Sequence, residues 1–92
     1  MRGSIWKFPA RIGDEFTTAM PEGAAILSVQ LQGDHPQMWV HVPDVSAPTL
    51  DRKFVWYGTG HPLPAAPGKF IATVQCCGGA LVFHLFEQEP TP

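Results

Sequence analysis

The sequence predicts an all-β fold, a small single-domain antiparallel barrel or sandwich of about six to seven strands. Apolar and polar residues alternate with a period of two in several segments, which is typical of half-buried strands. Ten prolines and nine glycines interrupt the 92 residues too often for long helices. Hydrophobic residues make up 45% of the chain and charged residues 15%, so a modest core can form and a disordered, solvating chain is excluded.

Four strand patterns are found in the first half of the chain. They cover residues 5–8, 14–21, 24–32 and 38–42. The third is the clearest, because Leu27, Val29 and Leu31 alternate with polar residues and predict one wet face. Residues 33–36 predict a hairpin loop before the fourth pattern, and residues 43–51 predict a loop with room for a short helical turn.

Three further strand patterns follow in the second half. They cover residues 52–57, 69–77 and 80–87. Gly78 and Gly79 predict a two-residue hairpin turn between the last two, because glycine accepts the positive φ angles of such turns. The last pattern is apolar on both faces, so this strand is expected to be central in its sheet or covered by a partner chain.

The alternation also assigns an interior. The side chains expected there are Leu27, Val29, Val40, Phe54, Phe70 and Leu81. A core of this size has little room for three tryptophans as well, and exposed aromatic surface marks an interface. We expect Trp6 to pin the first strand to the core, whereas Trp39 fits the core and an interface equally well.

Length, charge and hydropathy restrict the setting. The length predicts one domain, residues 1–88, followed by a tail at 89–92 that is expected to fray. The net charge of −2 disfavours duplex nucleic acid as a partner, because phosphate neutralisation supplies much of that affinity. No apolar run approaches the roughly 18–20 residues of a membrane span, and the first residues carry no secretory signal, so we expect no membrane partner.

The two cysteines, Cys76 and Cys77, are adjacent in the sequence. Neighbouring side chains of a strand point to opposite faces, so we expect no disulfide between them. No third cysteine is available as a partner. This usage is typical of a reduced, cytoplasmic compartment.

The most distinctive binding motif is the loop at residues 58–62, with the strand that precedes it. Two glycines would let backbone N–H groups approach an anion, while a hydroxyl and an imidazole add hydrogen-bonding groups. Basic residues on the preceding strand would supply charge, and an aromatic ring would stack a base. The candidate ligand-binding residues are Arg52, Lys53, Trp56, Tyr57, Gly58, Thr59, Gly60 and His61. The alternative is a strand-exit turn whose glycines serve backbone geometry alone.

The remaining polar residues indicate neither a metal site nor an enzyme. No histidine or cysteine pair has zinc-ligand spacing, and no cofactor or hydrolase signature occurs, so we expect no metal, no cofactor and no catalytic residue. Apolar and aromatic surface on two strands instead predicts a homo-oligomer. The candidate interface residues are Trp39, His41, Val82, His84 and Phe86.

Five blocks of the chain carry a family resemblance. They read WKFP at 6–9, MP at 20–21 followed by Gly23, ILSVQ at 26–30, GTGHP at 58–62 and GGALVFHLFE at 78–87. Over nearly the whole chain, this pattern resembles a family of small proteins found in phages, prophages and bacteria. The resemblance implies a small accessory protein that acts in the bacterial cytoplasm, and it carries over no catalytic residue.

The resemblance and the loop chemistry together favour a non-enzymatic, anti-defence binding protein. It would sequester a nucleotide immune signal, of cyclic or ADP-ribose type, at a subunit interface. One alternative is a protein–protein inhibitor of a host defence factor, or a phage structural accessory. Another is a small hydrolase of a nucleotide signal, with His61 as its acid–base group.

Overall fold

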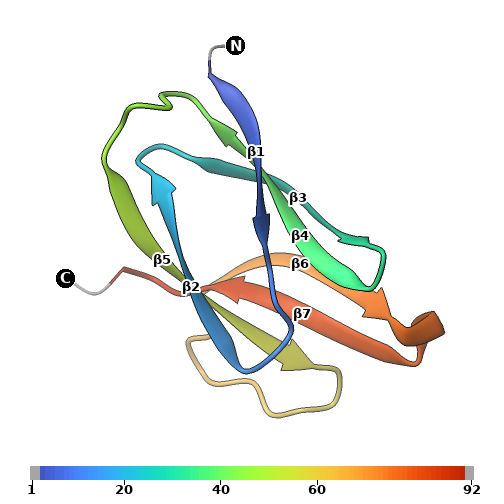
Figure 1. The fold of residues 1–92 in the computed structure, drawn as a ribbon. Helices are drawn as coiled ribbons and strands as arrows, with labels where there is room; N and C mark the ends of the chain where they lie inside the picture. The colour runs from blue at the N-terminus through green and yellow to red at the C-terminus, as the bar shows by residue number, and fades with distance from the viewer. Residues whose placement is uncertain (1–2, 91–92) are drawn as a thin grey trace.

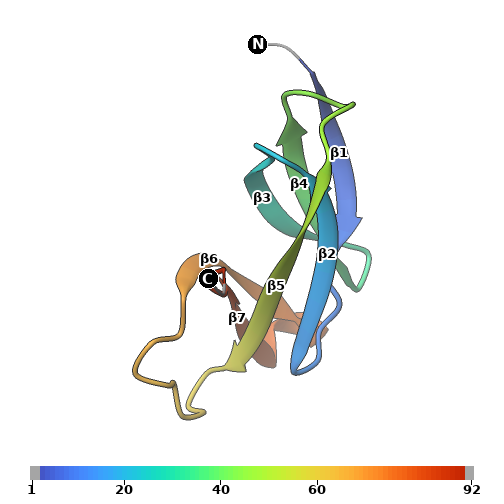
Figure 2. The ribbon, with the colours of Figure 1, turned by 90° about the vertical axis from the view of Figure 1, so that its left-hand side faces the viewer.

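The computed structural model describes residues 3–90 and arranges them in two antiparallel sheets (Figure 1, Figure 2). The elements are β1 Ser4–Pro9, β2 Glu15–Pro21, β3 Ala25–Gln32, β4 His35–Val42, β5 Thr49–Gly58, β6 Lys69–Cys76, the 3-10 turn η1 Cys77–Gly79, and β7 Leu81–Glu87. The three-stranded sheet has the order β1-β4-β3, and the four-stranded sheet has the order β2-β5-β7-β6. The all-β prediction is confirmed, and of its two forms the structure is the sandwich, because neither sheet closes into a barrel.

The inner faces of the two sheets share one core. From the three-stranded sheet, Met38 and Val40 are fully buried on β4. From the four-stranded sheet, Phe54 on β5 and Leu85 on β7 are fully buried, and the ring of Phe16 stacks on that of Phe54 at 5.0 Å between centroids. The strand alternation therefore works as expected wherever a strand pairs without interruption.

Two bulges overturn part of the predicted interior. The register of β3 against β4 shifts between Ile26 and Ser28, and Leu27 becomes the unpaired residue, 52% exposed. The register of β6 against β7 shifts at Ile71, between Phe70 and Ala72. A bulge inserts one residue and so reverses the face of everything before it.

The second shift moves Phe70 to the outer face, where it lies opposite Phe86 and is 54% exposed. Leu81, at the first position of β7, is 49% exposed. The assignments of Leu27, Phe70 and Leu81 to the interior are therefore wrong, whereas those of Val29, Val40 and Phe54 are confirmed. Trp6 lies on the inner face of β1, opposite Val40, and its ring meets that of Phe8 at 6.2 Å between centroids, although it remains 36% exposed on this edge strand.

The connections differ from their predictions in length. The hairpin from β3 to β4 needs only Gly33 and Asp34, because His35 already pairs with Gln32. The turn from β6 to β7 is four residues long instead of two, since the closing pair is Cys76 with Leu81. Residues 43–48 contain a turn and no helix.

An Asx turn orders the connection at residues 43–48. The carboxylate of Asp44 accepts hydrogen bonds from the Ser46 hydroxyl at 2.7 Å and the Ser46 N–H at 3.0 Å. These two bonds hold the pKa of the Asp44 carboxyl below its usual value, because they favour the charged form.

Strand β7 is central in its sheet, as its two apolar faces predicted. Its inner face packs into the core through Leu85, and its outer face carries Val82, His84 and Phe86. Of the tail at 89–92, residues 91 and 92 lie outside the described residues. Within residues 3–90 there is no helix long and apolar enough to cross a membrane.

Candidate functional site

A pocket of about 240 Å³ lies on the outer face of the four-stranded sheet. It is formed where the loop that follows β5 faces the exposed sides of β6 and β7. Its lining residues are Tyr57, Gly58, Thr59, Gly60, His61, Leu63, Phe70, His84 and Phe86. It thus combines five of the eight predicted ligand-binding residues with two of the five predicted interface residues.

Aromatic rings form one wall of this pocket. The rings of Tyr57 and Phe86 meet edge to face at 5.5 Å between centroids, and those of Phe70 and Phe86 do the same at 5.6 Å. These contacts join β5, β7 and β6 across the sheet, so the rings are held by three neighbouring strands. Phe70 remains 54% exposed, which leaves aromatic surface open for a flat ligand.

His84 is held between two threonine hydroxyls. Its Nε2 lies 2.8 Å from Oγ1 of Thr59, and its Nδ1 lies 2.8 Å from Oγ1 of Thr73. The Thr59 hydroxyl also donates to the carbonyl oxygen of Val82, at 3.3 Å, so its oxygen accepts from Nε2–H and Nδ1 accepts from Thr73 in the neutral ring. Because both nitrogens already have partners, His84 offers a ligand the face of its ring.

The loop amides are less available to an anion than the two glycines suggest. The N–H of Thr59 donates to the carbonyl of Val82 at 3.1 Å, and the N–H of His61 donates to that of Gly58 at 3.1 Å. The loop is therefore fastened to β7 and closed by a turn of its own. No Lys or Arg lines this pocket, so its lining supplies no permanent positive charge for an anion.

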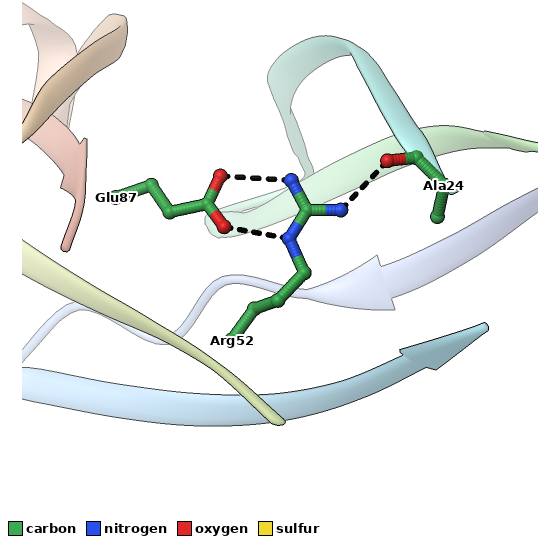
Figure 3. A network of polar contacts seen from close by, with 3 residues as sticks. All are labelled: Ala24, Arg52 and Glu87. Atoms are coloured by element: carbon green, nitrogen blue, oxygen red, sulfur yellow. Dashed lines mark hydrogen bonds and ion pairs between the residues drawn. The ribbon is translucent and has the colours of Figure 1, made fainter. Parts of the chain in front are cut away.

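Arg52 lies toward the other end of β5, six residues or about 20 Å along the strand from Gly58. Its guanidinium forms a two-pronged ion pair with Glu87, at 2.6 and 2.8 Å, and donates to the carbonyl oxygen of Ala24 at 2.7 Å (Figure 3). Both charged side chains are partly buried, 23% and 17% exposed. Arg52 thereby connects β5, β7 and the residue before β3, and it does not face the pocket.

Lys53 and Trp56 are placed away from the pocket as well. Lys53 points to the outer face but pairs with Glu15 on β2, with 3.2 Å between Nζ and Oε2. Trp56 is 5% exposed in the core, where its Nε1–H donates to the carbonyl of Arg11 at 2.9 Å. The predicted cluster of base-stacking ring, cation and glycine loop is therefore only partly assembled, with Tyr57 as its aromatic member.

The predicted interface residues divide between two outer faces. Val82, His84 and Phe86 belong to the four-stranded sheet. Trp39 and His41 belong to the outer face of the three-stranded sheet, where Trp39 lies opposite Lys7 and His41 opposite Ile5. The two groups do not form one continuous surface, because the core lies between the sheets.

Sequence reasoning missed two lining residues and one supporting residue. Phe70 was assigned to the interior, and only the bulge at Ile71 places it in the pocket. Leu63 lies in a Pro- and Ala-rich loop that carries no recognisable signal. Thr73 could have been found, because strand pairing places it directly opposite His84.

A larger hollow, of about 490 Å³, lies between the β1–β2 connection and the β3–β4 turn. Arg11, Asp34 and His35 line it together with Ile12, Gln37 and two prolines, and of these residues only Pro36 and Gln37 are not exposed. These side chains form no ring stack or hydrogen bond to one another. The smaller pocket is the better candidate, because strand pairing and hydrogen bonds hold its lining in place.

A family model described as a domain of unknown function, DUF7352, matches residues 1–92. The chain therefore belongs to this family over the whole of the given sequence. No curated protein and no solved structure matches it significantly.

Proposed function

We propose that this protein is a non-enzymatic binding protein that captures the flat ring of a nucleotide-type ligand in the pocket on the four-stranded sheet. The observation that supports this most is the aromatic wall of Tyr57, Phe70 and Phe86 beside the ring face of His84. Stacking of a base on one such ring contributes about 1–3 kcal/mol and depends little on base identity.

The lining suggests which end of the ligand enters. The pocket lacks Lys and Arg, so the base would occupy the aromatic wall and the phosphates would lie toward His61 at the rim. A volume of about 240 Å³ is below the roughly 300–1,000 Å³ of typical ligand pockets. A second copy of the chain would enclose the exposed remainder, so the proposal places the ligand at a homo-oligomer interface.

The biological setting rests on the family resemblance. A small phage-borne accessory protein of the bacterial cytoplasm would use such a pocket to sequester a nucleotide immune signal and so counter host defence. Nothing in the lining supplies a carboxylate or a metal ligand set for hydrolysis, which is why we favour binding over turnover.

A second candidate is a protein–protein inhibitor or structural accessory that docks through the same surface. The exposed side chains of Leu63 and Phe70, each just over half exposed at 53% and 54%, favour it, since they extend the aromatic wall outward. The two candidates differ in whether a small molecule alone stabilises the fold.

The test is a thermal-shift screen of purified protein against mononucleotides, cyclic dinucleotides and ADP-ribose. A ligand at 100 times its Kd adds about 2.7 kcal/mol to the free energy of unfolding. For a domain of this size, this corresponds to a rise in Tm of roughly 10–20 °C. Recovery of the ligand unchanged separates binding from hydrolysis.

Phe70→Ala is expected to weaken binding of the identified nucleotide about tenfold, because it removes a stacking surface. Leu50→Ala is the matched control, since Leu50 is 53% exposed on β5 but does not line this pocket. Equal affinity in both variants, or no stabilisation by any nucleotide, would contradict the proposal and favour the protein-docking role.

A further inference from the structure

The turn between β6 and β7 holds the two cysteines with their sulfur atoms 3.4 Å apart. Cys76 is the last residue of β6 and is 7% exposed, whereas Cys77 is the first residue of η1 and is exposed. Figure 1 shows this turn as the short coil between β6 and β7, away from the loop that follows β5. None of residues 76–80 lines the pocket, so the chemistry of these thiols is independent of the proposed function.

The backbone explains why strand alternation misjudged this pair. Cys77 has a φ of 58°, the one positive value of a non-glycine residue among residues 3–90. A residue in this left-handed region leaves the extended strand, so its side chain does not continue to the opposite face. The expectation that the two thiols point apart is therefore wrong, and both sulfurs lie on the same side of the turn.

The left-handed conformation of Cys77 also carries a cost in free energy. A non-glycine residue in the left-handed region costs about 1–2 kcal/mol. The next two residues, Gly78 and Gly79, also have positive φ angles, of 68° and 86°, but glycine takes them without that cost. Cys77 is thus a left-handed, non-glycine residue, and its conformation places its thiol beside that of Cys76.

We propose that Cys76 and Cys77 form a dithiol–disulfide pair that low-molecular-weight disulfides oxidise and low-molecular-weight thiols reduce. In the first step, the Cys77 thiolate attacks one sulfur of an oxidant R–S–S–R, forms a mixed disulfide and releases RS⁻, which takes up a proton. In the second step, Cys76 loses its proton and its thiolate attacks the Cys77 sulfur, which forms the vicinal disulfide and releases the second RSH. Two S–H bonds of the protein are exchanged for one S–S bond, and the oxidant is reduced to two thiols.

The exposed fractions of the two thiols determine which one reacts first with the external disulfide. Only Cys77 is open to an external disulfide, while Cys76 is buried and already within 3.4 Å of the sulfur that it must attack. The hydrogen bond with the Cys77 thiol, followed by burial, raises the pKa of Cys76. Cys76 is therefore a poor first nucleophile near neutral pH, and the resolving step should accelerate as the pH rises.

The product should be easy to reduce. Every peptide bond in residues 3–90 is trans, so the α-carbons of neighbouring residues are about 3.8 Å apart, below the usual 4.4–6.8 Å of disulfide-bonded pairs. Strain of this kind makes a disulfide more oxidising and more readily exchanged. The pair is thus suited to reversible oxidation and not to permanent crosslinking.

The experiment treats the reduced full-length protein with oxidised glutathione and follows intact mass and the masses of proteolytic peptides. The wild-type chain should lose the mass of two hydrogen atoms with little accumulated adduct, and dithiothreitol should restore the original mass. Cys76→Ser should stop at a mixed disulfide that carries one glutathione on Cys77. Cys77→Ser should lose the rapid reaction, because only the buried thiol remains.

Three results would overturn the proposal. They are a wild-type chain that keeps its glutathione adduct as Cys76→Ser does, a wild-type chain that instead forms a Cys77-linked dimer, and a Cys77→Ser variant that reacts as fast as wild type. Circular dichroism of both variants provides the folding control. If a variant unfolds, the mass and adduct yield of the folded wild-type chain across a pH series still decide between the vicinal disulfide and the adduct.

Discussion

The two ends of β5 differ in whether their side chains already have hydrogen-bond and ion-pair partners. At the Arg52 end, a guanidinium, a carboxylate and a backbone carbonyl neutralise and hydrogen-bond one another. At the Gly58 end, the loop is fastened by backbone hydrogen bonds, but rings and Leu63 remain exposed around a pocket. The first arrangement stabilises the fold, whereas the second leaves apolar surface exposed, where we propose that a ligand binds.

This difference shows why residue type alone is a poor guide to a site. An arginine beside a glycine loop in sequence suggests a phosphate contact, but Arg52 is already paired with Glu87, 35 residues away. A phenylalanine in an alternating strand suggests core, but Phe70 is exposed in the pocket. What matters is whether the tertiary structure has already supplied a partner.

Of the variants compared in this section, Gly68→Ala is expected to destabilise the fold most. Gly68 lies at the Arg52 end, where an added Cβ would meet backbone atoms. Gly68 has a φ of 96°, and a Cβ there would overlap the backbone carbonyl oxygen of Glu87, which cannot move without disturbing β7. We expect a loss of about 3 kcal/mol or more in the free energy of unfolding, from strain plus the overlap. Urea denaturation measures this loss as a lower midpoint.

Gly60→Ala is the matched control at the other end of the same loop. Gly60 has a similar φ of 86°, but a Cβ there meets no heavy atom within 4 Å. Only the conformational strain remains, about 1–2 kcal/mol. If the two variants lose the same stability, the contrast between a closed and an open end is incorrect.

Arg52→Ala should have the next largest effect. It leaves the Glu87 carboxylate and the Ala24 carbonyl without their partner in a partly buried position. Loss of one partner of a buried pair costs about 3–5 kcal/mol, and the remaining exposure of 23% and 17% reduces our expectation to about 2–3 kcal/mol. The double variant Arg52→Ala with Glu87→Gln should recover part of this loss, since no unpaired charge remains.

Lys53→Ala is the control for that ion pair. Lys53 is the next residue on β5, but it and its partner Glu15 are 51% and 58% exposed. Exposed pairs contribute about 0–1 kcal/mol and lose that in salt. A Lys53→Ala variant as unstable as Arg52→Ala would show that burial of the pair is not the cause.

Gly58→Ala should have the smallest effect on stability and a specific effect on the pocket. A Cβ at Gly58 would lie 2.9 Å from Cε1 and Nδ1 of the His61 ring, which is exposed and can rotate away. We expect a stability change within about 1 kcal/mol and a displaced His61 resonance in NMR spectra. Gly13→Ala is the control, because nothing lies within 4 Å of its added Cβ, and an unmoved His61 resonance in Gly58→Ala would contradict the close packing of Gly58 against that ring.

The sequence by itself determined the strands, because alternation and turn residues act locally. Val29, Val40 and Phe54 were assigned correctly to the interior, and β7 was expected to be central from its two apolar faces. The loop from Gly58 to His61 was also identified, since glycines after a strand are a strong local signal.

Only the tertiary structure decided which side chains meet. Single-residue bulges at Leu27 and Ile71 turn the preceding residues to the opposite face of the sheet. The alternation of apolar and polar residues does not reveal where such a bulge occurs. The pairing of Arg52 with Glu87 depends on β5 and β7 lying side by side, which only the strand order of the finished sheet provides. The approach of the two cysteine sulfurs likewise depends on one left-handed residue that closes the β6–β7 turn. Secondary structure follows from local sequence patterns because it depends on neighbouring residues. A site instead requires contacts between residues that are distant in sequence and meet only when the chain folds.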